Sequence, residues 1–366
     1  MSHPWHYAVV VGIDQYPELD GGKRNLTCPL ADAIEMAGWL GDPDGGQLPA
    51  ENVHLITRES PKLDSRRPPV PLQEEIYRAI LTVVRAFHAA KDELPLATEQ
   101  KKAWEQSRFY FYISGHGIDA SGDDTVVIAA NSSHDYLGMH ISTRGLLNTL
   151  RKDSVFAEIV VIADACREFA YSAIAPPPFL MDRYKGFNSE LGSKVFYASA
   201  SRTRKKAYEP PPEAGLTHSF FTHSLLQGLR GGVVGGEVTS EKLSDFLYND
   251  VPALTKRFLN VSQNPEISFD PGIVFVRSPQ RTHEVVASTK EARQFAGVSA
   301  LDAIVYAGGG VKERFGFVVD PDGFTHRVQL PGGSYLIVPQ GADPLQAGGR
   351  LQSITVLSLP IHVDLP

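Results

Sequence analysis

Short apolar runs alternate with segments of helical periodicity along most of the chain. Runs rich in valine and aromatic residues predict buried strands, which we place at residues 7–13, 53–57, 108–114, 125–130, 158–166, 194–201 and 272–276. Helical periodicity covers residues 30–40, 72–90, 143–152, 218–231 and 239–258. Strands that alternate with helices predict an α/β fold with a doubly wound, mostly parallel sheet. Functional side chains then gather beyond the carboxyl ends of its strands.

The last part of the chain has a different pattern. From about Ser278 the helix signals fade, and short strands alternate with turns rich in Gly, Pro and Asp. The segment VVDPDGFTHRV predicts a β-hairpin with Asp322 and Gly323 at its turn. A chain of 366 residues is long enough for two domains. We therefore expect an α/β domain over residues 1–277 and a small β-rich domain over residues 278–366.

The composition narrows the class of protein. A net charge of −7 gives no support to nucleic-acid binding or to binding of anionic membranes. The chain has two cysteines, Cys28 and Cys166, so a secreted disulfide scaffold is excluded and a reducing compartment fits best. We find no signal peptide, and no apolar run reaches the roughly 18 residues needed to span a bilayer. We therefore expect a cytoplasmic protein with neither nucleic acid nor membrane as a partner.

Polar side chains stand where three of the predicted strands end. Asp14 follows the first strand, His116 follows the strand 108–114 between two glycines, and Asp164 and Cys166 end the strand 158–166. A cysteine nucleophile needs a base or a cation nearby, because a free thiol is mostly protonated at pH 7. Gly117 can leave room for substrate, and its amide together with that of Cys166 can form an oxyanion hole. The pattern indicates acyl-transfer chemistry at one sheet edge.

Each of these residues also has a simpler structural explanation. His116 could bond to the backbone at a strand end, and Cys166 could be an inert buried thiol, which is what we expect for Cys28. Asp164 could stabilise a turn. Asp32 could owe its place to the start of a helix, where the dipole favours a carboxylate.

Other acidic residues lie close to the predicted site. Asp119, Asp123 and Asp124 follow His116 and could bind Ca²⁺ through oxygen ligands, but the regular spacing of a calcium-binding loop is absent. Glu168 could add negative charge to a pocket or lie solvated in a loop. We therefore expect no cofactor and no metal, with Ca²⁺ as the alternative.

The order of these segments resembles the caspase-type cysteine peptidases of clan CD, family C14, in the branch of metacaspases, paracaspases and prokaryotic caspase homologues. YAVVVGIDQYPEL resembles the first strand and the Gly-Ile-x-x-Tyr motif, and ADA resembles the Asn-Asp-Ala start of the first helix. FYFYISGHG and IVVIADAC resemble the histidine and cysteine strands. YASASRTRKKAYE is similar to the substrate-binding strand and loop, and HSFFTHSLLQGL to the following helix. His116 and Cys166 lie 50 residues apart, as in caspases, with Glu168 where caspases have Gly.

This resemblance covers about residues 7–277 and implies a caspase-like three-layer fold. It implies that Cys166 is the nucleophile, that His116 is the general base and acid, and that the amides of Gly117 and Cys166 form the oxyanion hole. Two aspartates line an acidic S1 pocket in metacaspases, and they match Asp32 and Asp164. The resemblance therefore implies cleavage after Arg or Lys. The segment CPLADA departs from the metacaspase pattern by one extra residue and by Ala in place of Asn.

Further expectations follow from the resemblance and from two basic segments. Prokaryotic relatives often belong to defence or regulated-death systems, so the resemblance implies protein substrates, including ones encoded alongside, and an activating sensor or partner protein. Arg183, Lys185, Arg204, Lys205 and Lys206 are candidate self-cleavage sites. Alternative functions are a caspase-type peptidase that prefers P1 Asp, a non-catalytic adaptor on the same fold, and another hydrolase or acyl transferase.

Overall fold

The computed structural model describes residues 3–59, 71–119, 124–133, 140–169, 192–203, 205–233, 237–277, 282–290, 298–307, 310–331, 333–342, 352–356 and 361–364. The chain forms two compact units. The first comprises Met1–Leu226 and Leu247–Ile273, and the second comprises Gln227–Phe246 and Val274–Pro366. Within the described residues, no helix is both long enough and apolar enough to cross a membrane.

A six-stranded sheet in the order β11-β9-β7-β3-β1-β2 forms the centre of the first unit. Its strands are β1 (His6–Gly12), β2 (Val53–Ile56), β3 (Arg108–Ser114), β7 (Glu158–Asp164), β9 (Lys194–Ser199) and β11 (Glu266–Phe269). All neighbours pair in parallel except β11, which is antiparallel to β9. The register places Ser114 beside both Gly12 and Asp164. The carboxyl ends of β1, β3 and β7 are therefore level, as a shared site at this edge requires.

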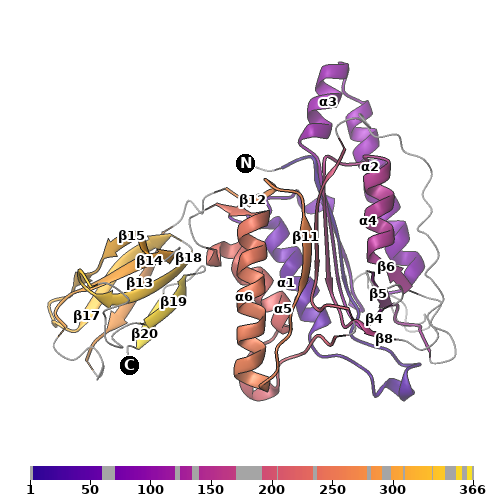
Figure 1. The fold of residues 1–366 in the computed structure, drawn as a ribbon. Coiled ribbons are helices and arrows are strands. Elements are labelled where there is room, and N and C mark those ends of the chain that lie inside the picture. The colour runs from indigo at the N-terminus through magenta and orange to yellow at the C-terminus, as the bar shows by residue number, and fades with distance from the viewer. Residues whose placement is uncertain are drawn as a thin grey trace. The chain divides into compact units, whose positions relative to one another are not determined.

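Helices cover both faces of this sheet, and the result is the three-layer α/β arrangement that the sequence predicted. The helices are α1 (Pro29–Gly41), α2 (Gln73–Asp92), α3 (Ala97–Glu105), α4 (Thr143–Lys152), α5 (Phe220–Gln227) and α6 (Ser240–Leu259). Figure 1 shows α2 and α4 on one face and α1 and α5 on the other. In α2 the buried side chains of Ile76, Ile80, Val83 and Phe87 recur every three or four residues, so one face of the helix packs on the sheet.

Two predicted strands lie outside the central sheet. The predicted strand 125–130 is β5 (Thr125–Ile128), which belongs to a small sheet in the order β6-β5-β4-β8. Its other strands are β4 (Gly117–Asp119), β6 (His140–Ser142) and β8 (Glu168–Phe169). The predicted strand 272–276 is β12 (Val274–Val276), which pairs with β10 (Val238–Thr239). The sixth strand of the central sheet is β11, whose short, half-exposed sequence EISF carries little apolar signal.

The C-terminal part contains two four-stranded sheets, in agreement with the predicted β-rich character. Their orders are β16-β17-β13-β20 and β15-β14-β18-β19. The strands are β13 (Thr282–Ser288), β14 (Leu301–Ala307), β15 (Gly310–Gly316), β16 (Val318–Val319), β17 (Thr325–Pro331), β18 (Gly333–Pro339), β19 (Gln352–Val356) and β20 (Ile361–Asp364). The predicted hairpin joins β16 to β17. Gly323 has a φ of 72°, and Oδ1 of Asp322 accepts the Phe324 amide at 2.9 Å.

Candidate active site

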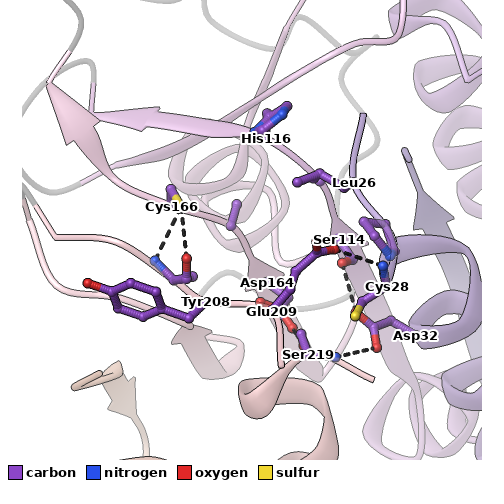
Figure 2. A pocket seen from close by; sticks show the side chains of 14 residues that line it. Leu26, Cys28, Asp32, Ser114, His116, Asp164, Cys166, Tyr208, Glu209 and Ser219 are labelled. Atoms are coloured by element: carbon purple, nitrogen blue, oxygen red, sulfur yellow. Dashed lines mark hydrogen bonds between the residues drawn. The ribbon is translucent and has the colours of Figure 1, made fainter. Parts of the chain in front are cut away.

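A pocket lies at the carboxyl ends of β3 and β7 and brings together several of the residues that the sequence analysis singled out (Figure 2). His116 and Cys166 both line it, and both are partly buried. Asp32, Asp164 and Cys28 line the same pocket. The strands end at the same level, and α1 begins beside them. The predicted pair His116 and Cys166 and the predicted pair Asp32 and Asp164 therefore line one cavity.

The two glycines around His116 permit close approaches to neighbouring loops. A Cβ atom at Gly115 would lie 2.6 Å from the hydroxyl of Tyr16. A Cβ atom at Gly117 would lie 2.4 Å from the carbonyl oxygen of Cys166 and 2.7 Å from Cβ of Ala165. The space beside Gly117 is therefore filled by the cysteine loop. The expectation that this glycine clears space for substrate is wrong on that side of the residue.

A backbone carbonyl fixes the tautomer of His116. Its Nε2 lies 2.5 Å from the carbonyl oxygen of Arg24. A carbonyl oxygen can only accept a hydrogen bond, so Nε2 must carry a hydrogen. The neutral ring therefore leaves Nδ1 as the nitrogen that can take a proton.

The thiol of Cys166 is bonded to the main chain of Ala207. Sγ donates to the Ala207 carbonyl oxygen at 3.2 Å and accepts from the Ala207 amide at 3.2 Å (Figure 2). We call residues 205–209 the strap. Further hydrogen bonds fix the strap before and after Ala207. The amide of Arg167 donates to the Lys205 carbonyl at 2.9 Å, and the amide of Tyr208 donates to Oε1 of Gln263 at 2.8 Å.

Glu209 ends the strap and was not singled out from the sequence. Its Oε1 accepts the amides of Thr27 and Cys28, each at 2.8 Å, and its Oε2 accepts the Thr27 hydroxyl at 3.0 Å. These amides immediately precede α1, where a negative charge is favoured by the helix dipole. In the sequence, Glu209 begins the segment EPPPE. No local pattern, however, links its first residue to a helix about 180 positions earlier.

Asp32 and Asp164 are buried at the base of the pocket. Asp32 accepts the amide of Ser219 at 3.1 Å and the hydroxyl of Ser114 at 3.2 Å. Asp164 accepts the hydroxyl of Thr222 at 2.6 Å and also that of Ser219. Burial raises the pKa of both carboxyl groups, and the charge of Asp32 raises the pKa of Asp164 further. These two carboxyls are therefore poised to gain from a cation that enters the pocket.

Two further residues near the base of the pocket come from the segment before α5. Nδ1 of His218 lies 3.3 Å from Oδ1 of Asp32, and Ser219 bonds to both aspartates. The sequence predicted helix from residue 218, whereas α5 begins at Phe220. Because His218 and Ser219 precede the helix, the His218 side chain and the Ser219 amide both face Asp32.

Cys28 behaves as a buried thiol rather than as a second nucleophile. It is 4% exposed and precedes α1. Burial raises the pKa of its thiol, and the negative charges of Asp32 and Glu209 raise it further. Cys28 therefore stays protonated at neutral pH.

Other predicted residues lie elsewhere or outside the described residues. Asp14 pairs with Nε of Arg58 at 2.7 Å and does not line the pocket. Asp124 accepts the Arg144 amide at 2.8 Å and the Ser142 hydroxyl at 2.6 Å, so it caps the start of α4.

Several side chains that the sequence singled out are not among those that the structure describes. Asp123, Arg183, Lys185 and Arg204 lie outside the described residues, as do the side chains of Asp119 and Glu168. Among the described side chains, no group of three or more His, Cys, Asp or Glu residues is arranged to hold a metal ion. Lys205 and Lys206 are exposed on the strap.

Comparisons with known proteins establish the family of the chain. Residues 6–271 match the caspase domain family of peptidases, peptidase family C14. This match covers well over half of the chain, so the chain belongs to the caspase family, and the predicted caspase-like fold is confirmed.

Individual relatives are more distant. A probable protease of a Desulfuromonadales bacterium is 28% identical over 236 residues, which are 62% of this chain and 26% of that protein. This chain therefore corresponds to about a quarter of its curated relative. Among solved structures, caspase-1 of Spodoptera frugiperda is 11% identical with a TM-score of 0.46, covering 76% of this chain and 92% of its own. A Geobacter sulfurreducens protein is 16% identical with a TM-score of 0.42, covering 75% and 98%.

Proposed function

We propose that the chain is a cysteine endopeptidase that cleaves protein substrates after arginine or lysine. One observation carries this proposal: a single pocket holds His116 and Cys166 together with the two buried carboxyls of Asp32 and Asp164 (Figure 2). The first pair can cleave a peptide bond, and the second pair can select the residue before it.

In the proposed reaction, Cys166 gives its thiol proton to Nδ1 of His116 and its sulfur attacks the scissile carbonyl carbon. The amides of Gly117 and Cys166 stabilise the oxyanion that forms. His116 then gives the proton to the leaving amine, and a water molecule hydrolyses the thioester. The bond from the thiol to the Ala207 carbonyl must break before the attack, so the observed state is a resting state.

The pocket favours a cationic P1 side chain for an electrostatic reason. Burial disfavours the charged form of both carboxyls, as their raised pKa values show. A guanidinium or ammonium group in the pocket would stabilise the charged form through charge-assisted hydrogen bonds. A P1 aspartate would bring a third negative charge beside Asp32 and Asp164. We therefore expect cleavage after Arg and Lys to exceed cleavage after Asp.

Self-cleavage after Lys206 stays a prediction, and it requires the strap to rearrange. The amide of Ala207 donates to Sγ, which places the sulfur near the plane of the Lys206–Ala207 peptide. Attack on a carbonyl carbon comes from above that plane. The activating partner, the role in prokaryotic defence or regulated death, and the cytoplasmic location also stay predictions from the family resemblance.

A matched set of peptides tests the proposal. Fluorogenic peptides that differ only in P1 Arg, Lys or Asp are compared on the wild type and on the Cys166→Ala and His116→Ala variants. We expect turnover of the Arg and Lys peptides by the wild type. The loss in either variant should be at least about a thousandfold, since nucleophile and base act as a unit.

Two results would contradict different parts of the proposal. Turnover retained in Cys166→Ala would reject the nucleophile, and preference for P1 Asp would reject the acidic pocket. Failure of an active-site cysteine probe to label Cys166 would favour a non-catalytic adaptor.

A further inference from the structure

Tyr16 lies against His116 and has no role in the proposed chemistry. It is fully buried in the loop that follows β1. Its hydroxyl accepts the amide of His116 at 2.8 Å and donates to the carbonyl of Ile128 at 3.5 Å. Its ring centroid lies 4.7 Å from that of the imidazole, with the planes tilted by 53°. The phenol thus contacts both the backbone and the ring of His116.

The sequence around His116 is adapted to this contact. A Cβ atom at position 115 would lie 2.6 Å from the Tyr16 hydroxyl, so a larger residue there would force the phenol to move. The carbonyl of His116 in turn accepts the amide of Ile128 at 2.9 Å, and Ile128 also receives the Tyr16 hydroxyl. The three residues form a closed set of hydrogen bonds behind the imidazole.

The loop that carries Tyr16 also carries the carbonyl that fixes the imidazole tautomer. The amide of Tyr16 donates to Oδ1 of Asn25 at 2.8 Å, and the carbonyl of the neighbouring Arg24 faces Nε2 of His116. The loop between β1 and α1 therefore contacts His116 at its backbone, at its ring face and at Nε2. A displacement of Tyr16 would disturb all three contacts.

We propose that Tyr16 is a positioning residue that holds the imidazole of His116 in the orientation and tautomer in which Nδ1 takes the proton of Cys166. Burial raises the pKa of Tyr16, so its hydroxyl keeps its hydrogen and can bridge the two backbone groups. A histidine held in this way needs little rearrangement before proton transfer, whereas misplacement by about 1 Å can cost about a hundredfold in rate. This inference rests on the proposed Cys166–His116 dyad.

The test compares Tyr16→Phe with Tyr110→Phe. The first variant keeps the ring and removes the hydroxyl. The second is the matched control, because Tyr110 is equally buried on β3, and its hydroxyl bonds to Arg108 at the other end of the strand. With a P1 Arg peptide we expect Tyr16→Phe to lower kcat by about ten- to a hundredfold with KM within about twofold. Tyr110→Phe should keep wild-type kcat.

A second readout does not depend on turnover. In ¹⁵N-histidine NMR, with His116 assigned from a His116→Gln variant, we expect one Nε2–H tautomer in the wild type. A broadened or mixed signal is expected in Tyr16→Phe. If no peptide is cleaved by the wild type, the proposed function fails, and this spectrum still decides the role of Tyr16.

The exposed Asn25 provides a second variant that does not disturb the core. If Tyr16→Phe does not fold, Asn25→Ala replaces it as the test. We expect Asn25→Ala to lower kcat as well, but by less than Tyr16→Phe would. The inference would be overturned if Tyr16→Phe kept both wild-type kcat and an unchanged His116 signal. If Tyr16→Phe does not fold, the same result in Asn25→Ala would overturn it. So would an equal loss of kcat in Tyr110→Phe.

Discussion

Asp32 and Asp164, the residues proposed to bind the P1 side chain, affect stability in a way that depends on pH. Burial raises the pKa of Asp164 to about 7 and also raises that of Asp32. From the ordinary aspartate pKa of about 3.9 up to these raised values, the folded state holds more protons than the unfolded state. The contribution of this pair to the free energy of unfolding therefore falls as the pH rises from about 4 to 7.

A guanidinium ligand should report this ionisation. We expect agmatine, a small guanidinium compound, to bind more tightly as the pH rises from 5 to 8, by up to about tenfold per unit for each carboxyl that loses a proton. Isothermal titration calorimetry at several pH values measures the effect. In Asp164→Asn the pH dependence should be weaker. Affinity that is flat or falls with pH in the wild type would contradict the acidic P1 pocket.

Among the structural elements, the strap links Cys166, the proposed nucleophile, to the helix that carries Asp32. Its Ala207 bonds to the thiol of Cys166, and its Glu209 bonds to the amides before α1. The strap therefore connects the part of the pocket around Cys166 with the start of α1, and its release should affect both of them.

Removal of the Glu209 carboxylate should loosen the strap. We expect Glu209→Ala to lower the free energy of unfolding by about 1 kcal/mol, as for loss of a helix cap, and to speed alkylation of Cys166 by iodoacetamide severalfold. Glu99→Ala, in the first turn of α3, is the control and should change neither quantity much. An unchanged alkylation rate in a destabilised Glu209 variant would show that the strap does not shield the thiol.

The elements also show what could be predicted from the sequence. The strands that precede His116 and Cys166 are long apolar runs, and their order and spacing were enough to predict one shared edge. The strand β11 was missed because Glu266 and Ser268 interrupt its four residues. Glu209 and His218 were missed because their partners lie far away in the sequence, and no local pattern encodes such contacts.

On the scale of the whole molecule, the compact units do not follow the predicted boundary after residue 277. The second unit includes Gln227–Phe246, in which Leu229 and Val233 are buried. The helical turn Gly228–Gly232 contacts β18 and β19 of the same unit. A chain that ends at Arg277 would lose these strands and expose that segment.

Truncation after Arg277 should therefore destabilise what remains. Exposure of a buried leucine or valine costs about 1.5–3 kcal/mol, so we expect a clear fall in Tm by differential scanning calorimetry. Leu229→Ala in the full chain is the companion variant and should lower Tm in the same direction by a smaller amount. A truncated chain with the Tm of the full chain would show that residues 1–277 are stable alone.

The hydrogen bonds between Cys166 and Ala207 have a consequence for inhibitors. Because the thiol is bonded to Ala207, we expect an electrophile to react with the sulfur only after these hydrogen bonds break. Peptide aldehydes with a P1 arginine should therefore show slow-binding kinetics, with an association rate limited by movement of the strap. Compounds that supply their own carbonyl and amide at the position of Ala207 should associate faster than simple alkylating agents of equal intrinsic reactivity.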